Sequence, residues 1–238
     1  MTHDSTTTPG ASGAPSAAGG PTARPTIGIV GAGRVGTALA RALVAVGHEV
    51  RVATHRPAVE NSLLVEVSAP GASAVDIPDA AACDLVVLAL PLHRAATLDP
   101  ATFAGRTVVD VMNYWPPVDG TIARLEEDPR SSSEVLAEHL PGATVVRALN
   151  HIGYHELEED ARPAGDPERR ALAVASDDPA ATARVAALVE ALGFDAVDAG
   201  PLAAAAHLQQ GTEIFDGRRH DAAEIRAILA EAGYAVAS

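Results

Sequence analysis

The segment Thr26-Ile-Gly-Ile-Val-Gly-Ala-Gly-Arg-Val-Gly36 decides the fold of this chain. A short β-branched run leads into Gly31-x-Gly33-x-x-Gly36, and an Ala-, Leu- and Val-rich helical pattern follows. Between a strand and a helix, the first glycine permits a tight turn, the second lets backbone approach a pyrophosphate, and the third lets the helix pack on the strand. The N–H groups at the start of the helix face the phosphates in such folds. The segment therefore predicts a dinucleotide site built from Gly31, Ala32, Gly33, Arg34, Val35 and Gly36.

The end of the next predicted strand indicates which dinucleotide binds. It reads Thr54-His55-Arg56, where an NAD-binding chain carries an Asp or Glu for the ribose 2′-hydroxyl. Glu49 lies at the beginning of that strand, too far back for this role. A hydroxyl next to a guanidinium suits a 2′-phosphate, because arginine donates paired, charge-assisted hydrogen bonds. We therefore expect NADP(H), with the alternative that Arg56 only begins a solvated loop. Arg34 either lies over the pyrophosphate or faces solvent.

Composition limits the class of protein and its partners. The chain has 238 residues, enough for one large domain or for one domain with a small lobe. Its formal net charge of −14 argues against a nucleic-acid partner and against an anionic membrane surface. A phosphate site must therefore be built locally, from helix N–H groups and a few arginines. The single cysteine, Cys83, excludes an internal disulfide and a Cys-based metal cluster.

The beginning of the chain differs from the rest. Residues 1–24 are mostly Ser, Thr, Pro, Gly and Ala and lack the apolar h-region of a signal peptide. Such a segment cannot bury enough surface to order itself, so we expect a disordered tail. No apolar run approaches the roughly 18 residues of a membrane-spanning helix. We therefore expect a cytoplasmic protein.

Apolar runs alternate with helical patterns after residue 25. Such alternation is typical of a parallel sheet with helices on both faces. The continuous apolar run at 85–90 suits a central strand buried on both sides. Strands are predicted at 27–30, 50–53, 85–90, 107–111 and 144–149, with a weaker one at 72–76, and helices at 35–46, 59–67 and 133–139.

The chain after Asn150 continues this pattern. A strand is predicted at 171–175, a helix at 179–192, a strand at 194–197, and helices at 202–210 and 222–232. The predicted fold class is α/β, a Rossmann-type doubly wound, mostly parallel sheet with a small C-terminal α/β extension. The predicted parts are a tail at 1–24, an NADP-binding domain at 25–150, and an extension at 151–238 that completes the sheet and the substrate cleft or a dimer interface.

Ligands in such sheets bind outside the carboxyl ends of the strands, where three segments carry unusual residues. Asn113 and Asn150 either bond the ribose or carboxamide of a nicotinamide nucleotide or close turns. His93 either lies near the phosphates or is exposed at a helix start. Tyr114 and Trp115, in an aromatic-poor chain, contact a flat ligand or another subunit, or plug the core. The candidate cleft residues are Leu90, Pro91, His93, Asn113, Asn150 and His151.

Catalytic side chains are not predicted. His151 and His155 are four residues apart, but Gly153 between them weakens a helical pair and no third metal ligand is present. His151 is therefore expected in the wall of the pocket, and no metal is expected. The sequence holds no Gly-x-Ser-x-Gly elbow and no paired-carboxylate pattern, and its acidic runs fit solvated faces.

These features together resemble the NADPH-dependent reductases of the deazaflavin coenzyme F420, also called F420:NADP oxidoreductases. The glycine segment, Thr54-His-Arg56, the strand at 85–90 with Pro91, Ala148-Leu-Asn-His151 and Asp198-Ala-Gly-Pro-Leu202 fall in the family's order. The resemblance covers roughly 26–210. The segment Asn113-Tyr-Trp-Pro-Pro117 and the chain from Gly211 onward depart from the family pattern.

The resemblance implies hydride transfer between NADP(H) and coenzyme F420 as the second, small-molecule redox substrate. In that family the protein positions two stacked rings and excludes water, and no side chain is an essential acid or base. The implied roles are the 2′-phosphate for Thr54-His-Arg56 and the ring cleft for Pro91, Asn113 and Asn150-His151. The resemblance also implies a homodimer, because the last helices often pair there.

Two other functions stay open at this stage. One is a related reductase of another flavin or of a small imine or carbonyl substrate, which a Tyr114-Trp115 wall narrowing the cleft favours. The other is a non-catalytic NADP-binding module that senses redox state through a partner. A closed cleft over the nicotinamide, or a partner-sized apolar surface at 211–238, favours that module.

Overall fold

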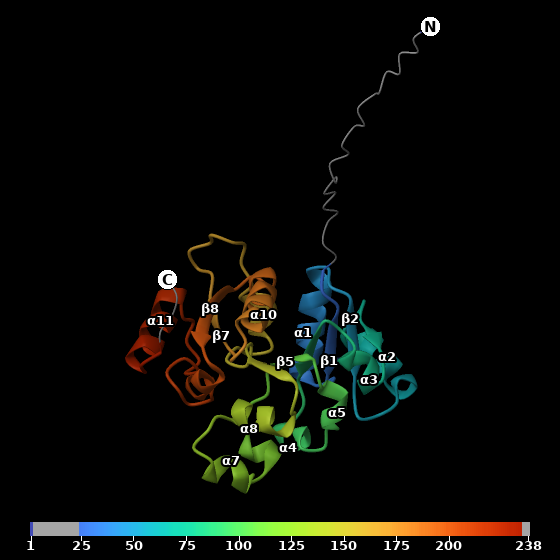
Figure 1. Ribbon diagram of the computed structural model, residues 1–238, viewed down its shortest axis with the longest axis horizontal. Coiled ribbons are helices and arrows are strands. Elements are labelled where there is room, and N and C mark those ends of the chain that lie inside the picture. Colours follow the sequence, from blue (N-terminus) through green and yellow to red (C-terminus); the bar gives the residue numbers. More distant parts are fainter. Residues whose placement is uncertain (2–23, 235–238) are drawn as a thin grey trace.

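The computed structural model describes Met1 and residues 24–234. Residues 2–23, on which the predicted tail falls, lie outside the described residues. The described part is built on one eight-stranded sheet with the order β3-β2-β1-β4-β5-β6-β7-β8 (Figure 1). All neighbouring strands pair in parallel except β6 and β7, which are antiparallel. The predicted doubly wound, mostly parallel fold with a C-terminal extension is confirmed.

The strands are short and apolar. Every residue of β4 is buried, as expected for a central strand with helices on both sides. The strand bounds are β1 Ile27–Val30, β2 Val50–Ala53, β3 Ser73–Ala74, β4 Leu85–Leu88, β5 Thr107–Asp110, β6 Thr144–Arg147, β7 Ala171–Ala175 and β8 Asp195–Gly200.

Helices cover both faces of the sheet. Alternate strand residues face opposite sides, because successive side chains of a strand point to opposite faces. One face packs against α1, α2 and α10, and the other packs against α3, α4, α5 and α8, with η1 and α11 over β7 and β8. The bounds are α1 Arg34–Ala45, α2 Ala58–Ser68, α3 Ile77–Ala81, α4 Leu92–Ala95, α5 Pro100–Phe103, α6 Pro116–Asp119, α7 Ala123–Glu127, α8 Ser132–His139, α9 Glu156–Glu159, α10 Pro179–Ala191, the 3₁₀ helix η1 Leu202–Leu208, and α11 Ala222–Glu231.

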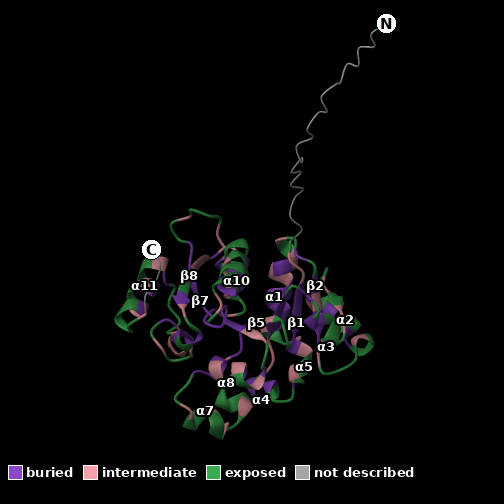
Figure 2. Cartoon of the chain, in the orientation of Figure 1, coloured by how far each residue is buried: buried purple, intermediate pink, exposed green. Residues whose placement is uncertain are grey.

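The burial pattern follows these layers. Figure 2 shows buried residues along the strands and exposed residues on the outer helices.

The helix predicted at 202–210 is instead a 3₁₀ helix that ends at Leu208. The short helices α3, α4, α5, α6, α7 and α9 were not predicted, since four or five residues are too few to give a helical period. Within the described residues, no helix is long and apolar enough to cross a membrane.

Candidate functional site

The three motif glycines have different surroundings. Gly31 has a φ of 124°, and a Cβ there would lie 2.2 Å from the carbonyl oxygen of Ala89. A Cβ on Gly36 would lie 2.0 Å from the carbonyl oxygen of Gly31. A Cβ on Gly33 would meet no atom within 4 Å. Gly31 and Gly36 are therefore required by the fold itself, whereas at Gly33 the backbone faces open space.

That open space belongs to a cavity of about 850 Å³. It extends from the glycine loop to the end of β2 and is bordered on the other side by the segment after β4. The start of α1 contributes N–H groups, because the first turn of a helix has no intrahelical acceptors. The space in front of Gly33 and the volume fit a bound dinucleotide. Of the predicted residues, the cavity is lined by Gly31, Ala32, Gly33, Thr54, His55, Arg56, Leu90 and Pro91.

The loop after β2 is held in shape by its own hydrogen bonds. The backbone N–H of Arg56 donates to Oγ1 of Thr54 at 3.0 Å. Nδ2 of Asn61 donates to the carbonyl oxygens of Arg56 and Pro57 at 2.9 and 3.0 Å. Asn61 is buried in α2, and sequence reasoning missed it because an Asn inside a helix carries no distinctive pattern. These bonds fix the backbone while His55 and Arg56 remain exposed.

Arg56 and Arg94 provide positive charge at this cavity. Both line it, and neither forms an ion pair with another described residue. Unpaired guanidinium groups in a chain of net charge −14 mark the places where an anion is favoured. The sequence analysis did not single out Arg94, although it directly follows His93.

Arg34 lies at the rim of the glycine loop. Its guanidinium carbon is 5.8 Å from the centre of the Tyr154 ring, a cation–π distance. The ring of His155 packs edge-on against Tyr154, with centroids 5.4 Å apart. Helix α9, which follows the loop carrying Tyr154, is tied to α1 by an ion pair between Arg41 and Glu158 at 2.8 Å. Arg34 therefore joins the glycine loop to the segment that follows β6.

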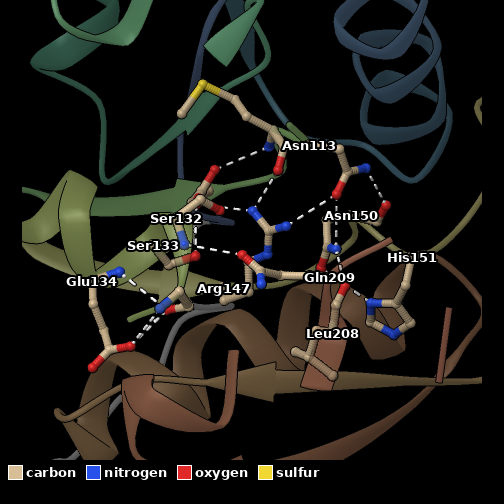
Figure 3. Close-up of polar contacts among 12 residues, drawn as sticks. Asn113, Ser132, Ser133, Glu134, Arg147, Asn150, His151, Leu208 and Gln209 are labelled. Atoms are coloured by element: carbon tan, nitrogen blue, oxygen red, sulfur yellow. Dashed lines mark hydrogen bonds and ion pairs between the residues drawn. The ribbon is translucent and has the colours of Figure 1, made fainter. Parts of the chain in front are cut away.

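A buried polar network holds the ends of β5 and β6 together (Figure 3). Arg147 is 1% exposed and forms an ion pair with the fully buried Asp110 at 2.9 Å. Arg147 also donates to the carbonyl oxygen of Met112 and, at 3.0 Å, to Oδ1 of Asn113. Ser133 at the start of α8 donates to Asp110 at 2.8 Å. Burial lowers the pKa of the Arg147 guanidinium, and the charge of Asp110 opposes that effect.

The amides of Asn113 and Asn150 are part of this network. Nδ2 of Asn113 donates to the carbonyl oxygen of Asn150 at 2.8 Å, and Nδ2 of Asn150 donates to Oδ1 of Asn113 at 3.2 Å. Nδ2 of Asn150 also donates to the carbonyl oxygen of Leu208, at the end of η1. Leu149, just before Asn150, has a positive φ of 57°, which turns the chain there. Both amides are thus bonded within the protein, and their contact with a nicotinamide nucleotide stays a prediction.

His151 is fully enclosed. The N–H of Ala173 donates to its Nε2 at 3.0 Å, so Nδ1 carries the proton and faces Oδ1 of Asn150 at 3.2 Å. Burial, followed by the charge of Arg170, lowers the pKa of His151 to about 3. His151 is therefore a neutral residue that joins β6 to β7.

Several predicted residues of the candidate site do not line the large cavity. His93 lines a separate cavity of about 300 Å³, and its Nδ1 is 2.9 Å from Asp119. Asn113 and Tyr114 line a third cavity of about 230 Å³, next to Arg147. Trp115 is 48% exposed and lines none of these three cavities, while Val35 packs against the core. The structure thus does not bring His93 to the glycine loop.

Metal binding is not indicated by the side-chain arrangement. Among the residues that the structure describes, no three His, Cys, Asp or Glu side chains are grouped so that they could hold a metal ion. Cys83 is a buried free thiol.

Comparison with known proteins agrees with this geometry. A family sequence model described as "NADP oxidoreductase coenzyme F420-dependent" matches residues 26–114, from β1 to the residue after Asn113. The match therefore includes the glycine loop, the end of β2 and the segment after β4.

Two solved structures are similar over most of the chain. A hypothetical protein from Sinorhizobium meliloti is 30% identical, with a TM-score of 0.69, over 82% of this chain and 96% of that one. A protein from Arthrobacter that carries the provisional name of F420-dependent NADP reductase is 27% identical, with a TM-score of 0.62, over 75% of this chain and 86% of that one.

A curated relative is similar over a longer protein. Metalloreductase STEAP3 of Rattus norvegicus is 29% identical over 193 residues, which is 79% of this chain. The chain spans 36% of the length of that relative. On the family match and the two solved structures, the chain belongs to the family described as coenzyme F420-dependent NADP oxidoreductases.

Proposed function

We propose that this chain transfers a hydride between NADP(H) and the deazaflavin coenzyme F420. The observation that carries the proposal is the cavity of about 850 Å³. The glycine loop lines one part of it and leaves open space in front of Gly33, and Arg56 lines another part, after the end of β2. NADPH supplies a hydride from C4 of its nicotinamide, and a proton from water completes the reduced deazaflavin. The family description and the name of the Arthrobacter relative support the choice of acceptor.

The cavity residues bind and orient the dinucleotide in this proposal. The N–H groups at the start of α1 bond the pyrophosphate, since a helix N-terminus favours an anion. Thr54 and Arg56 bond the 2′-phosphate, and Arg94 adds a second positive charge on the opposite wall. Arg34 lies at the rim, where its guanidinium reaches the pyrophosphate by leaving the Tyr154 ring.

The network at the ends of β5 and β6 acts by positioning. Asn113, Asn150 and His151 are bonded to one another or to backbone, and His151 is neutral near pH 7 because burial lowers its pKa to about 3. Hydride transfer needs the two reacting carbons at about 3–3.5 Å in a fixed orientation, and such alignment alone supplies much of the rate. A rigid strand edge whose buried charges, Arg147 and Asp110, are paired with each other suits that task.

A second candidate acceptor is a small imine or carbonyl compound or another flavin. The observation that favours a small acceptor is the size of the cavity beside Asn113 and Tyr114, about 230 Å³. Pockets for ligands of drug size are about 300–1,000 Å³, so this cavity suits a smaller molecule than a three-ring deazaflavin.

The decisive experiment compares acceptors in one assay. NADPH oxidation at 340 nm is followed with coenzyme F420, FMN, FAD and a cyclic imine at equal concentrations, and NADH replaces NADPH in parallel reactions. We expect turnover with NADPH and F420, and kcat/KM at least tenfold higher than with any other acceptor. Faster turnover of the imine or of a flavin would transfer the assignment to the second candidate. No turnover with any acceptor, in protein that binds NADPH, would favour the redox-sensing module.

A matched control removes one arginine at a time. Arg56→Ala is compared with Arg106→Ala, which deletes the same charge from an exposed position at the amino-terminal end of β5, whereas Arg56 follows the carboxyl end of β2. The proposal requires that only Arg56→Ala raises KM for NADPH. Equal effects of the two variants would indicate a general charge effect instead of a phosphate contact.

A further inference from the structure

A second cavity lies behind α4, apart from the cofactor cavity. It measures about 300 Å³ and is bordered by α4, by the chain from α6 to α7 and by α8; Figure 1 shows α4, α7 and α8 together at the lower edge of the molecule. Among the described residues, none lines both cavities. Pro91 and Arg94 line the cofactor cavity, whereas Leu92, His93 and Ala95 line the smaller one, so α4 forms a wall between them. We call the smaller one the α4 cavity.

The α4 cavity has the form of a small-molecule site. Such sites are concave, mostly apolar and equipped with a few fixed polar groups, and those for drug-sized ligands measure about 300–1,000 Å³. The α4 cavity is at the lower end of that range, so it suits a molecule of one or two rings. Its apolar lining includes Leu92, Ile122, Leu125, Val135 and Leu136.

Asp119 fixes the ring of His93 at this cavity. Oδ1 of Asp119 accepts the backbone N–H of His93 at 3.1 Å and lies 2.9 Å from Nδ1 of its ring, and Oδ2 accepts the N–H of Trp115 at 2.8 Å. Burial raises the pKa of Asp119, but these hydrogen bonds outweigh it and hold the pKa below its ordinary value. Since an ionised carboxylate only accepts, Nδ1 of His93 carries a proton, and Nε2 of the neutral ring is an acceptor. The side chain of His93 is 39% exposed, so this acceptor is open to a ligand.

His139 adds a ring nitrogen that has no partner. The ring lines the α4 cavity from the end of α8, and its Nε2 is buried without a hydrogen bond to any described residue. Most buried polar atoms in folded proteins have a partner, because a missing hydrogen bond is costly. Turning this ring toward the cavity breaks no hydrogen bond of Nε2, and a ligand there supplies the missing one.

The charges at the α4 cavity are already paired. Asp119 is bonded to His93, and Arg124 forms an ion pair with Glu138 at 2.8 Å. Among the described residues that line the cavity, no other Asp, Glu, Lys or Arg is present. An anionic or cationic ligand therefore finds no free opposite charge, and a neutral ligand is favoured.

A hydroxyl group matches the two imidazole rings. It donates to Nε2 of His93, and because it both donates and accepts, it bonds Nε2 of His139 in either tautomer. A carboxylate only accepts and would face the lone pair of His93. A phenol hydroxyl is a stronger donor than an alcohol hydroxyl, and its aromatic ring packs against the apolar lining.

We propose that the α4 cavity binds a small neutral phenol of one or two rings, at a site distinct from those of the dinucleotide and the hydride acceptor. The phenol hydroxyl donates to Nε2 of His93, and the ring packs against Leu92 and Leu136. Because α4 also carries Arg94, the ligand lies directly behind a residue that lines the cofactor cavity.

Isothermal titration of the full chain with three probes of one ring system tests the chemistry of the site. 2-Naphthol donates and accepts, 2-methoxynaphthalene only accepts, and 2-naphthoate carries a negative charge. At pH 8, where imidazole rings are ordinarily neutral, 2-naphthol should bind once per chain. Its affinity should exceed that of each other probe by roughly tenfold, the order expected for one hydrogen bond. Absence of 2-naphthol binding, equal binding of 2-methoxynaphthalene, or tighter binding of 2-naphthoate would each overturn the proposal.

Replacing His93 by asparagine tests the acceptor. The amide N–H of asparagine replaces Nδ1–H as donor to Asp119, but no atom replaces Nε2. His93→Asn should therefore weaken 2-naphthol binding roughly tenfold and leave 2-methoxynaphthalene binding unchanged. His155→Asn, at an exposed histidine that lines none of the three cavities, is the matched control and should change neither. Ala96→Trp, at an exposed position of the α4 cavity, should block both probes without unfolding the protein. Unchanged 2-naphthol binding in His93→Asn or in Ala96→Trp would overturn the proposal.

Titration in saturating NADPH separates the two cavities. The Kd for 2-naphthol should change by less than about fivefold, which is below the usual range of coupling between sites. A larger increase would mean that the probe contacts the dinucleotide, and it would overturn the proposal. None of these titrations depends on the hydride acceptor, so failure to reduce coenzyme F420 would leave their outcome unaffected.

Discussion

Replacing Gly33 by valine should separate dinucleotide binding from folding. Gly33 precedes α1 with φ −80° and ψ −171°, an extended conformation that valine adopts without strain. A Cβ at this position meets no atom within 4 Å, so the side chain enters the cavity and not the core. The added carbons would occupy the space in front of the phosphate-binding turn. The folded protein should therefore persist while the bound pyrophosphate is displaced.

The expected magnitudes follow from these distances. Gly33→Val should change the free energy of unfolding by no more than about 0.5–1 kcal/mol, as for surface changes without a clash. NADPH at about 100 times its Kd stabilises the wild type by about 2.7 kcal/mol. For a chain of this length that is a rise in Tm of roughly 5–11 °C. The variant should lose this rise, which corresponds to a Kd at least 100-fold higher.

Differential scanning fluorimetry with and without NADPH measures both quantities. Gly36→Ala is the contrasting variant, because its Cβ would lie 2.0 Å from the carbonyl oxygen of Gly31 and must shift backbone. It should lower Tm even without NADPH. Gly33 does not face the bound pyrophosphate if Gly33→Val keeps an NADPH-induced rise in Tm like that of the wild type, or if the Tm of Gly33→Val without NADPH falls as far as that of Gly36→Ala.

Three further predictions concern charge and burial. Arg56→Ala should weaken NADPH binding by roughly 1.5–3 kcal/mol, the usual contribution of a hydrogen bond to a charged group, and should leave NADH binding unchanged in titrations. Equal losses of affinity for NADPH and NADH would contradict the 2′-phosphate assignment. Arg147→Met should cost about 3–5 kcal/mol in urea unfolding, because it leaves the Asp110 carboxylate buried without its partner, and adding Asp110→Asn should restore part of that loss. His151→Gln should reduce acid sensitivity between pH 6.5 and about 3. In this pH window His151 binds a proton in the unfolded chain but not in the folded protein, so the free energy of unfolding of the wild type decreases as pH falls. An equal pH dependence of unfolding in both proteins would show that His151 does not contribute.

The sequence predicted the sheet better than the helices around it. The strands predicted at 27–30, 50–53, 85–90, 107–111, 144–149 and 171–175 correspond to β1, β2, β4, β5, β6 and β7, because strands covered by helices on both sides are mostly apolar. The segment 202–210 differs from its prediction. Its apolar content predicted an α-helix, but after Pro201 the chain forms a 3₁₀ helix over the end of the sheet, and a run of alanines does not distinguish the two.

The candidate site could be predicted in part, for a physical reason. Gly31, Gly33 and Gly36 are determined by local backbone geometry, so their spacing was sufficient to identify the turn. The partners of Asn113 are not local. They are Arg147 and Asn150, 34 and 37 residues away, and only the pairing of β5 with β6 brings them together. A strand-end amide can therefore be recognised in a sequence, whereas its hydrogen-bond partners cannot.

The position of His151 explains how the extension is joined to the first half of the sheet. Strands β6 and β7 are antiparallel and are paired at Arg147 and Ala175, beyond which the chains separate. There Nε2 of His151 accepts the N–H of Ala173, and Arg170 donates to the carbonyl oxygen of His151 at 3.0 Å. Side chains thus take over the bonding where the backbone ladder ends, at the edge where α/β sheets bind ligands. Since a shift of 1 Å can reduce a positioned reaction about 100-fold, a neutral, fully bonded histidine suits the proposed hydride transfer better there than a mobile acid or base would.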